Sequence, residues 1–563
     1  MNDALHELRV LALDCQAGGA TPAHGDLLEL GWAVCAPEGI VDGVRSHWIL
    51  PRTARRVPRA VRELTGWSEH CIEDAIDEQR AWEKLRKDGA SVAAERASVP
   101  TVIHFARFEL PFLRDLHVRL GEGDAFPFDA ICVHAIAARL FPELPRRNIR
   151  ALAGYLGHSP ELVRRSAGHV EATAFIWRSL VPLLEQAGVA TWSDLSTWVA
   201  EAPSRPRRTR REFPFAVERR RALPDATGVY RFVRKSGDIL YVGKATSLKK
   251  RIAGHFKSSG PATERGLELL TQVHDILYTE TPSLLEAALL ETDEIKRLDP
   301  PYNVQLRRGE RRAWFASQDL ESAAPAADEL HRTGPLPSEH AASSLAALIQ
   351  LVRGETPTPR LRAMALAVPS AFLPDDELFA DGWRGFAEDV IARLGGGAAS
   401  ATRRVSQASR ELWLERGRAE PDASPEDAPP DHWDLPRVRR RLERNLVQSG
   451  LLLRRARFLC LLADAELSFQ ERRMKTARAL VSASTRIVEQ RDVESVSAIA
   501  GFPPRRPAPK LARQRAFDAA AYDRLRVVLT ELCRIRDEGG QLAFRVGTHF
   551  FEGPRFAKLV LAL

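Results

Sequence analysis

The chain has 563 residues, of which 44% are hydrophobic and 28% are charged, and its formal net charge is +8. This length exceeds what one hydrophobic core supports and predicts several domains, and the composition is ordinary for globular protein. The positive charge is spread over many acids, so by itself it is weak evidence for a nucleic-acid partner.

The spacing of the cysteines and the length of the apolar runs argue against two classes, proteins with a cysteine-bound metal centre and membrane proteins. The six cysteines never fall into a C-x-x-C spacing, which argues against a zinc knuckle or an iron–sulfur cluster and predicts reduced thiols in a cytoplasm. No apolar run reaches about 18 residues, and the start lacks a basic segment followed by an apolar one. We therefore expect a cytoplasmic protein with no membrane association.

Residues 1–200 show strand patterns first and helical patterns after them. Leu8 to Leu13 is a buried strand ending at Asp14, and antiparallel neighbours are expected at 28–35 and 44–50. A further strand at 99–104 is followed by expected helices at 108–120, 131–141, 149–156 and 171–184. This order predicts an α/β layer domain.

Three motifs in this segment point to a family: Leu64-Thr65-Gly66, the run from His104 to Leu113, and the run from Arg165 to Thr173. With them the segment resembles the DEDDh exonucleases, which have a DnaQ-like, RNase H-like fold. That family holds two metal ions with four acids and uses a histidine as general base. Position by position, the resemblance places the corresponding site on Asp14, Gln16, Glu109, Arg164 and His169.

The chemistry of these five positions departs from the family. Gln16 cannot carry the charge of a carboxylate, Arg164 puts a cation where metal ions would bind, and His169 replaces the last acid. We therefore expect a catalytically inactive exonuclease fold that serves DNA binding or packing. The alternative is an altered one-metal site built from Asp14, Glu109 and His169.

Residues 201–222 form an arginine-rich segment in which Pro203 and Pro206 break any helix. This composition predicts a linker without a core. Guanidinium groups bind phosphates, so DNA contacts are expected from Arg207, Arg208, Arg210 and Arg211. The alternative is a solvated spacer.

Two apolar runs at 229–233 and 239–242, separated by a polar turn, predict a hairpin with Tyr230 and Tyr241 on paired strands. A helix follows, capped by Thr246 or Ser247, with a core stripe of Leu248, Ile252 and Phe256. Arg251 and His255 are four residues apart and lie side by side on a flank of that helix, where an arginine suits a scissile phosphate.

A second helix is predicted to start with Thr281 as N-cap and Pro282 at its first position. Glu291 falls on the apolar face of this helix, where an acid is costly unless it is paired or binds a cation. Glu286 is expected to be solvated. The helix ends before Tyr302-Asn303.

The motifs Gly228-Val229-Tyr230 and Tyr241-Val242-Gly243, with the basic helix after them, resemble GIY-YIG nucleases of the UvrC/Cho type. The resemblance implies a small α/β domain over residues 223–306 with one divalent metal ion, Mg²⁺ or Mn²⁺, on Glu291. It also implies catalytic roles for six residues: Tyr230, Tyr241, Lys244, Arg251, His255 and Asn303. The tyrosines would position or deprotonate the attacking water, and Arg251 would bind the phosphate. Lys244 would support the tyrosines, and Asn303 would fix local hydrogen bonds. Lys249 and Lys250 are expected DNA contacts.

Residues 307–418 predict a UvrC-like helical connector, with Gly334-Pro-Leu-Pro-Ser338 before a helix at 341–352. The cysteine cluster of UvrC proteins is missing there, so no iron–sulfur cluster is expected. A linker rich in proline and aspartate spans 419–436. The last segment, 437–563, predicts an α+β domain of unknown role, with a strand at 458–462, a helix at 522–535 and a hairpin of 541–546 with 557–562.

These features predict a bacterial, metal-dependent DNA endonuclease of nucleotide-excision-repair type that makes a single incision near damage and is nucleoid-associated when it acts. Double-stranded DNA and damage-recognition proteins of the UvrA and UvrB type are the expected partners. One alternative is a 3′–5′ DNA exonuclease with a GIY-YIG accessory domain. Another is a non-catalytic DNA-binding repair adaptor.

Overall fold

The computed structural model of the chain describes residues 3–52, 57–93, 96–121, 125–158, 164–201, 212–257, 263–304, 313–391, 405, 407–409, 411–412, 432–503 and 505–553. Three expectations lie outside these residues: the phosphate contacts of Arg207, Arg208, Arg210 and Arg211, most of the linker at 419–436, and the strand at 557–562.

The chain divides into two compact units. The first comprises Met1–Ala226, Tyr230–Thr279 and Pro300–Tyr302, and the second comprises Thr227–Val229, Glu280–Asp299 and Asn303–Leu563. The predicted nuclease segment at 223–306 contributes to both units. The proposed division of the chain into six segments therefore stays a prediction.

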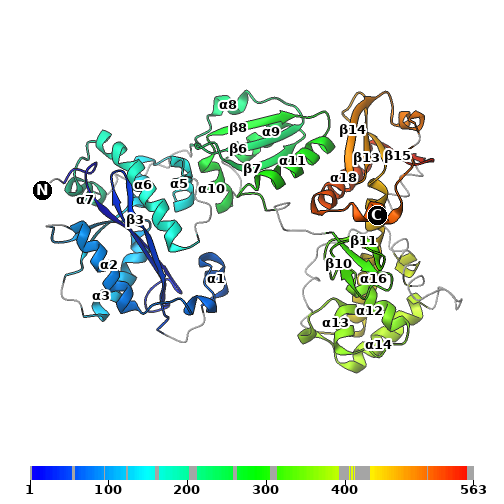
Figure 1. Cartoon of the computed structure of the whole chain (residues 1–563), viewed down its shortest axis with the longest axis horizontal. Coiled ribbons are helices and arrows are strands. Elements are labelled where there is room, and N and C mark those ends of the chain that lie inside the picture. Colours follow the sequence, from blue (N-terminus) through cyan, green and yellow to red (C-terminus); the bar gives the residue numbers. More distant parts are fainter. Residues whose placement is uncertain are drawn as a thin grey trace. The chain divides into compact units, whose positions relative to one another are not determined.

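The first unit begins with a five-stranded mixed sheet of order β3-β2-β1-β4-β5 (Figure 1). Its strands are β1 (Val10–Ala17), β2 (Leu27–Ala36), β3 (Gly39–Trp48), β4 (Val99–Ile103) and β5 (Phe128–Cys132). The first three strands are antiparallel, whereas β4 and β5 run parallel to β1. The predicted helix at 131–141 is therefore wrong at its start, because Ile131 and Cys132 complete β5.

Helices cover both faces of this sheet, because successive side chains of a strand point to opposite sides. Val10 and Ala12 pack into a core with α4 (Val133–Leu140), α5 (Ile149–Leu156) and α6 (Ser166–Gln186). Leu11 and Leu13 pack into a second core with α2 (Glu78–Ala93) and α3 (Ala106–Arg119). The shorter helices are α1 (Arg59–Thr65), η1 (Glu69–Ile72) and α7 (Trp192–Ala200). The mixed sheet with two covered faces confirms the predicted RNase H-like exonuclease fold.

A second, three-stranded sheet of order β7-β6-β8 follows. It contains β6 (Gly228–Val233), β7 (Ile239–Ala245) and β8 (Asp275–Glu280), with helices α8 (Val217–Arg221), α9 (Leu248–His255) and α10 (Glu264–Gln272). The predicted hairpin of β6 and β7 is present, and the Arg234 amide donates to the Asp238 carbonyl at 2.9 Å to close its turn. The predicted stripe of α9 is buried, and Ser247 rather than Thr246 caps that helix.

The helix α11 (Leu284–Leu298) belongs to the second unit. Two predictions about it are wrong. Ser283, not Thr281, is the N-cap, because its hydroxyl accepts the Glu286 amide at 3.1 Å while the Thr281 hydroxyl donates to the Ser283 carbonyl. Glu286 is only 7% exposed rather than solvated, because it forms an ion pair with Arg478, far along the sequence.

The connector contains a small sheet of order β10-β9-β11, with β9 (Trp314–Ser317), β10 (Ala323–Ala324) and β11 (His331–Leu336). Its helical elements are α12 (Ser343–Val352), α13 (Pro359–Leu366), η2 (Ser370–Phe372), α14 (Asp376–Phe386), η3 (Ala387–Ile391) and α16 (Leu435–Leu462). The strand predicted at 458–462 is wrong, because these residues form the last turns of α16. A short apolar run fits a buried strand and a buried helix equally well.

The last part is an antiparallel sheet of order β14-β13-β12-β15-β16. Its elements are β12 (Glu466–Gln470), β13 (Ala477–Ala483), β14 (Arg486–Val493), η6 (Val496–Gly501), α17 (Lys510–Arg515), α18 (Ala519–Asp537), β15 (Gln541–Val546) and β16 (His549–Glu552). The predicted helix at 522–535 lies within α18, and the overall α/β and α+β class is confirmed. Within the described residues, no helix combines the length and apolarity needed to cross a membrane.

Candidate active site

The residues predicted for the exonuclease site contact one another. Asp14, near the middle of β1, lies 2.9 Å from His169 in the first turns of α6, measured between Oδ1 and Nδ1. Gln16 Nε2 donates to the Arg164 carbonyl at 2.5 Å. The Arg164 side chain itself is exposed. Three of the five predicted side chains, those of Asp14, Gln16 and His169, are therefore engaged in hydrogen bonds within the domain.

Glu109, in the first turn of α3, is buried and accepts the Cys15 amide at 2.9 Å. Burial and the nearby charge of Asp14 raise the pKa of Glu109 well above its ordinary value of 4.5. The alternative of an altered one-metal site on Asp14, Glu109 and His169 stays a prediction.

A cluster of aromatic rings forms at the paired strands of the nuclease segment. The Tyr230 hydroxyl lies 2.7 Å from His255 Nε2, and the Tyr230 and Tyr241 ring centroids are 6.0 Å apart. Phe232 contacts both Tyr241 and His255. Tyr230 is fully buried, whereas Tyr241 is half-buried. Strand and helix thus bring three of the predicted catalytic side chains together.

Burial, and then the charge of Arg251, lowers the pKa of His255 from its ordinary 6.5 to about 4. The imidazole is therefore neutral at pH 7. With its proton on Nδ1, its Nε2 accepts a hydrogen bond from the Tyr230 hydroxyl.

Gly243 leaves the space that the two tyrosine rings occupy. A Cβ atom added at this position would lie 2.6 Å from the Tyr230 hydroxyl and 2.8 Å from Tyr241 Cε1. Real Cβ atoms essentially never approach so closely, so any side chain here would displace the rings. The glycine of the second motif is therefore a steric requirement of the tyrosine pair.

The remaining predicted positions are distributed over both units. Lys244 is half-buried on β7, and Lys249, Lys250 and Arg251 are exposed on α9. Glu291, half-buried on α11, and Asn303, buried just after Tyr302, belong to the second unit. The catalytic roles of all these residues stay predictions.

A polar network that sequence reasoning missed surrounds Tyr302, the residue before Asn303. Its hydroxyl donates to Glu268 Oε1 at 2.7 Å and accepts from Gln272 Nε2 at 2.6 Å. Asn148, on the exonuclease-like side, donates to the other Glu268 oxygen at 2.7 Å. Glu268 and Gln272 are buried and four residues apart on α10. This spacing places two polar side chains next to each other on one helix face, and it could have indicated the network from the sequence.

The donor set of the nuclease segment fits a hard divalent cation. Glu291 offers a carboxylate, and Mg²⁺ in proteins keeps several waters and binds through one or two carboxylates. Within the described ranges there is no group of three or more His, Cys, Asp and Glu side chains placed to hold a metal ion. A site with one protein carboxylate is compatible with Mg²⁺ or Mn²⁺.

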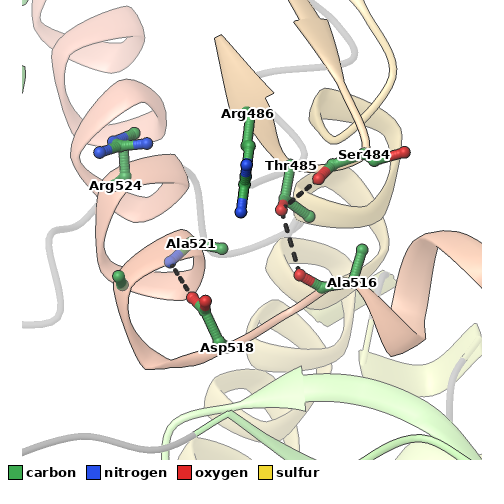
Figure 2. Close-up of a pocket in the computed structure, with 8 residues that line it drawn as sticks. Ser484, Thr485, Arg486, Ala516, Asp518, Ala521 and Arg524 are labelled. Atoms are coloured by element: carbon green, nitrogen blue, oxygen red, sulfur yellow. Dashed lines mark hydrogen bonds between the residues drawn. The ribbon is translucent and has the colours of Figure 1, made fainter.

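A cavity of about 670 Å³ lies in the C-terminal part, and no predicted site residue lines it. Figure 2 shows that Arg486 and Arg524 line it together with Thr485 and Asp518. Asp518 accepts the Ala521 amide as the cap of α18, and Arg524 pairs with Asp293 at 2.6 Å. Thr485, Asp518 and Arg524 have structural partners already, so the cavity is not a second candidate for the active site.

Comparison with known proteins identifies the nuclease segment. Residues 226–304 match the family model described as the UvrC-like GIY-YIG domain. UvrABC system protein C of Alkalilimnicola ehrlichii is 41% identical over 133 residues, covering 22% of this chain and 21% of that protein. The same protein of Neisseria meningitidis serogroup B is 46% identical over 85 residues, covering 15% and 14%. The chain thus spans about a fifth or less of the length of these curated relatives.

Solved structures are similar to both parts of the first half. The GIY-YIG N-terminal endonuclease domain of UvrC from Thermotoga maritima, bound to its catalytic divalent cation, is 30% identical, covering 16% of this chain and 93% of that chain, with a TM-score of 0.15. Exonuclease X in complex with 5′ overhanging duplex DNA is 17% identical, covering 34% and 99%, with a TM-score of 0.25. The predicted resemblance to UvrC-type GIY-YIG nucleases is confirmed over residues 226–304.

Proposed function

We propose that this chain is a metal-dependent DNA endonuclease that makes a single phosphodiester incision near damage, as in nucleotide-excision repair. The observation that carries the proposal is the UvrC-like GIY-YIG match at 226–304, inside which Tyr230, Tyr241 and His255 form one cluster. The exonuclease-like domain then serves as a DNA-binding or packing arm.

In this proposal the Tyr230 hydroxyl takes a proton from the attacking water while its own proton passes to His255 Nε2. The hydrogen bond of 2.7 Å between these groups, and the neutral state of His255, support that path. The water oxygen forms the new bond to phosphorus, and the bond to the leaving sugar oxygen breaks. General acid–base help of this kind contributes roughly 10²–10⁴-fold to a rate.

Arg251 is exposed and close enough to His255 to lower its pKa, so it can meet a phosphate beside the tyrosine cluster. Its guanidinium would neutralise the charge that develops on the phosphoryl oxygens. Lys249 and Lys250 on the same helix would contact the flanking backbone, and Lys244 would support the tyrosines. Asn303 would fix local hydrogen bonds.

Glu291 would hold one divalent ion, Mg²⁺ or Mn²⁺. When bound, this ion supplies Lewis-acid polarisation of the phosphate and lowers the pKa of nearby groups. Double-stranded DNA is the proposed substrate, and UvrA- and UvrB-type proteins are the proposed damage-recognition partners, in a bacterial cytoplasm.

The test is incision of a lesion-bearing duplex by the purified full chain with Mg²⁺ or Mn²⁺, with and without UvrA and UvrB. Wild-type protein should produce one nick. Arg251→Ala and Glu291→Gln should abolish it, whereas Asp14→Ala should leave it unchanged.

The other functions correspond to distinct results. Release of mononucleotides from a 3′ end, lost in Asp14→Ala but not in Glu291→Gln, would assign the activity to the exonuclease-like domain. Salt-sensitive DNA binding without cleavage in any divalent metal would indicate a non-catalytic repair adaptor.

A further inference from the structure

The helix that carries Glu291 shares a hydrophobic core with the C-terminal sheet domain, which has no assigned role. Leu285 is completely buried and Leu289 is 6% exposed, and both lie in one core with residues of β12, β13 and α18. By sequence α11 falls within the nuclease match at 226–304, but by its packing it belongs to the second unit. The C-terminal domain therefore contributes part of the surroundings of this helix.

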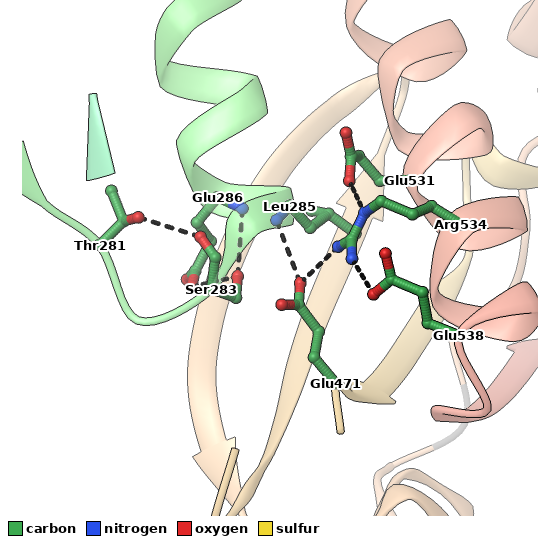
Figure 3. A network of polar contacts seen from close by, with 8 residues as sticks. All are labelled: Thr281, Ser283, Leu285, Glu286, Glu471, Glu531, Arg534 and Glu538. Carbon is green, nitrogen blue, oxygen red and sulfur yellow. Dashed lines mark hydrogen bonds and ion pairs between the residues drawn. The ribbon is translucent and has the colours of Figure 1, made fainter. Parts of the chain in front are cut away.

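Figure 3 shows how the first turn of α11 is held. The Leu285 amide, one of the donors that a helix start leaves without an intrahelical partner, donates to Glu471 Oε1 at 3.3 Å. Arg534 binds the same carboxylate at 3.0 Å and also pairs with Glu531 and Glu538 at 2.6 Å each. A carboxylate at this position also interacts favourably with the positive end of the helix dipole.

Two buried ion pairs fix α11 at separate points along its length. Glu286 pairs with Arg478 of β13, and both side chains are about nine-tenths buried. In the second half of the helix, Lys296 Nζ lies 2.5 Å from Asp523 of α18, a carboxylate that is 3% exposed. A more exposed pair joins Asp293 to Arg524 at 2.6 Å. Buried pairs have strict geometric requirements, so together they determine the rotation and the axial position of the helix.

Glu291 lies on the other side of α11. At about 100° per residue it is roughly 200° round the helix from both Leu289 and Asp293, and roughly 140° from Glu286 and Lys296. The residues that contact the C-terminal domain therefore lie behind Glu291. Glu291 itself is half-buried.

We propose that the C-terminal α+β domain is a positioning domain for the metal ligand, with Glu471, Arg478 and Asp523 as positioning residues that act through α11. The inference rests on the proposed function, because it assigns these residues to the orientation of Glu291. It gives residues 466–552 a role in metal binding rather than in contact with DNA.

The test is a charge exchange across the buried pair in the full chain. Lys296→Asp and Asp523→Lys each place two like charges in contact, whereas the double variant restores opposite charges. Mn²⁺ binding is followed by paramagnetic resonance, and the Glu291 site is defined as the binding that Glu291→Gln removes. Each single variant should weaken this binding about tenfold or more, as is typical for groups that orient a metal ligand.

In the single variants the nicking rate should fall together with Mn²⁺ affinity, whereas DNA affinity should stay within about twofold of wild type. The double variant should recover Mn²⁺ affinity and the nicking rate to within about threefold of wild type. Arg536→Glu is the matched control, because it reverses a charge on the same helix α18 whose ion pair is with its neighbour Asp537. It should behave as wild type.

A second pair of variants avoids buried like charges. Glu471→Ala removes the acceptor of the Leu285 amide, whereas Glu471→Gln keeps an oxygen there, so metal affinity should fall in the first and largely survive in the second. Folded single variants with wild-type Mn²⁺ affinity and rate would overturn the inference while leaving the nuclease proposal intact. If the wild-type protein does not nick and Glu291→Gln does not reduce Mn²⁺ binding, both the inference and the nuclease proposal are overturned.

Discussion

The first unit contains two clusters of side chains that resemble nuclease sites, and they differ in how their polar groups are used. In the exonuclease-like cluster, Asp14 pairs with His169, and Gln16 binds a backbone carbonyl. Glu109 is buried and accepts the Cys15 amide. In the tyrosine cluster, Tyr230 and neutral His255 form one hydrogen bond beside the exposed Arg251. The difference teaches that a set of site residues supports chemistry only when some of its groups still face a substrate.

The largest expected effect comes from breaking the hydrogen bond between Tyr230 and His255 in the tyrosine cluster. Tyr230→Phe removes the hydroxyl that contacts His255 and should lower the nicking rate roughly 10²–10⁴-fold, the usual contribution of a positioned acid–base group. Asp14→Asn, which alters the pair with His169, should leave nicking unchanged. Single-turnover rates with saturating Mn²⁺ measure both, and equal losses in the two variants would contradict the comparison.

Crowding the tyrosine pair should have the next largest effect. Gly243→Ala places a methyl group within 2.6 Å of the Tyr230 hydroxyl, so the ring must move. A shift of about 1 Å at a reacting group costs on the order of 10²-fold in rate. Gly254→Ala on α9 is the control, because nothing lies within 4 Å of its added Cβ. That variant should retain its activity and gain about 0.5–1 kcal/mol of stability. Unaltered nicking in Gly243→Ala would exclude a catalytic role for the pair.

Low pH should destabilise the folded protein through a buried histidine in each cluster, but only the histidine of the tyrosine cluster should also affect nicking. Burial lowers the pKa of His255 to about 4 and that of His104, beside the exonuclease-like cluster, to about 3, from an ordinary 6.5. The unfolded chain binds these protons first, so the free energy of unfolding falls as the pH falls from about 6.5 through these values. His104→Phe and His255→Phe should each reduce this loss, measured by hydrogen exchange at pH 7 and pH 5.

The nicking rate at pH 7 distinguishes the role of His255 from that of His104. His255→Phe should reduce it, because Tyr230 loses its partner, whereas His104→Phe should not. A loss of nicking in His104→Phe with an unchanged fold would show that the exonuclease-like cluster takes part in the reaction.

The smallest effect is expected for Glu109→Gln. Because the folded pKa of Glu109 is raised, wild-type protein loses stability as the pH rises above about 4.5, where the carboxyl ionises only in the unfolded chain. Glutamine does not ionise and can still accept the Cys15 amide. The variant should therefore be more stable than wild type at pH 7, with a flatter pH dependence and unchanged nicking. Denaturant unfolding at several pH values checks this sign.

Local patterns were sufficient for the tyrosine strands and for α9. Alternating apolar residues placed Tyr230 on a paired strand, and the spacing of Leu248, Ile252 and Phe256 gave the buried stripe. Phe232, two residues after Tyr230 on the same strand face, could have been added to the cluster by the same period of two. The roles of the site residues stay predictions.

The sequence alone could not show which residues far apart in the chain contact one another. Glu286 looked solvated because Arg478 lies 192 positions later, and Thr281-Pro282 looked like a helix start although Ser283 makes the capping bond. The run at 458–462 was taken for a strand because its continuation into the long helix α16 depends on packing over its whole length. The errors at Glu286 and at 458–462 concern residues whose state is decided by distant contacts, whereas the capping error is a local one.

The shared core of α11 restricts how this nuclease segment can be moved between proteins. A fragment cut at residue 304 would expose Leu285 and Leu289 to water and would leave Glu286 and Lys296 without their charge partners. Such a fragment is expected to aggregate rather than act as a transferable cassette. Chimaeras of this protein should therefore keep residues 284–298 together with 466–552, and swap the two as one block.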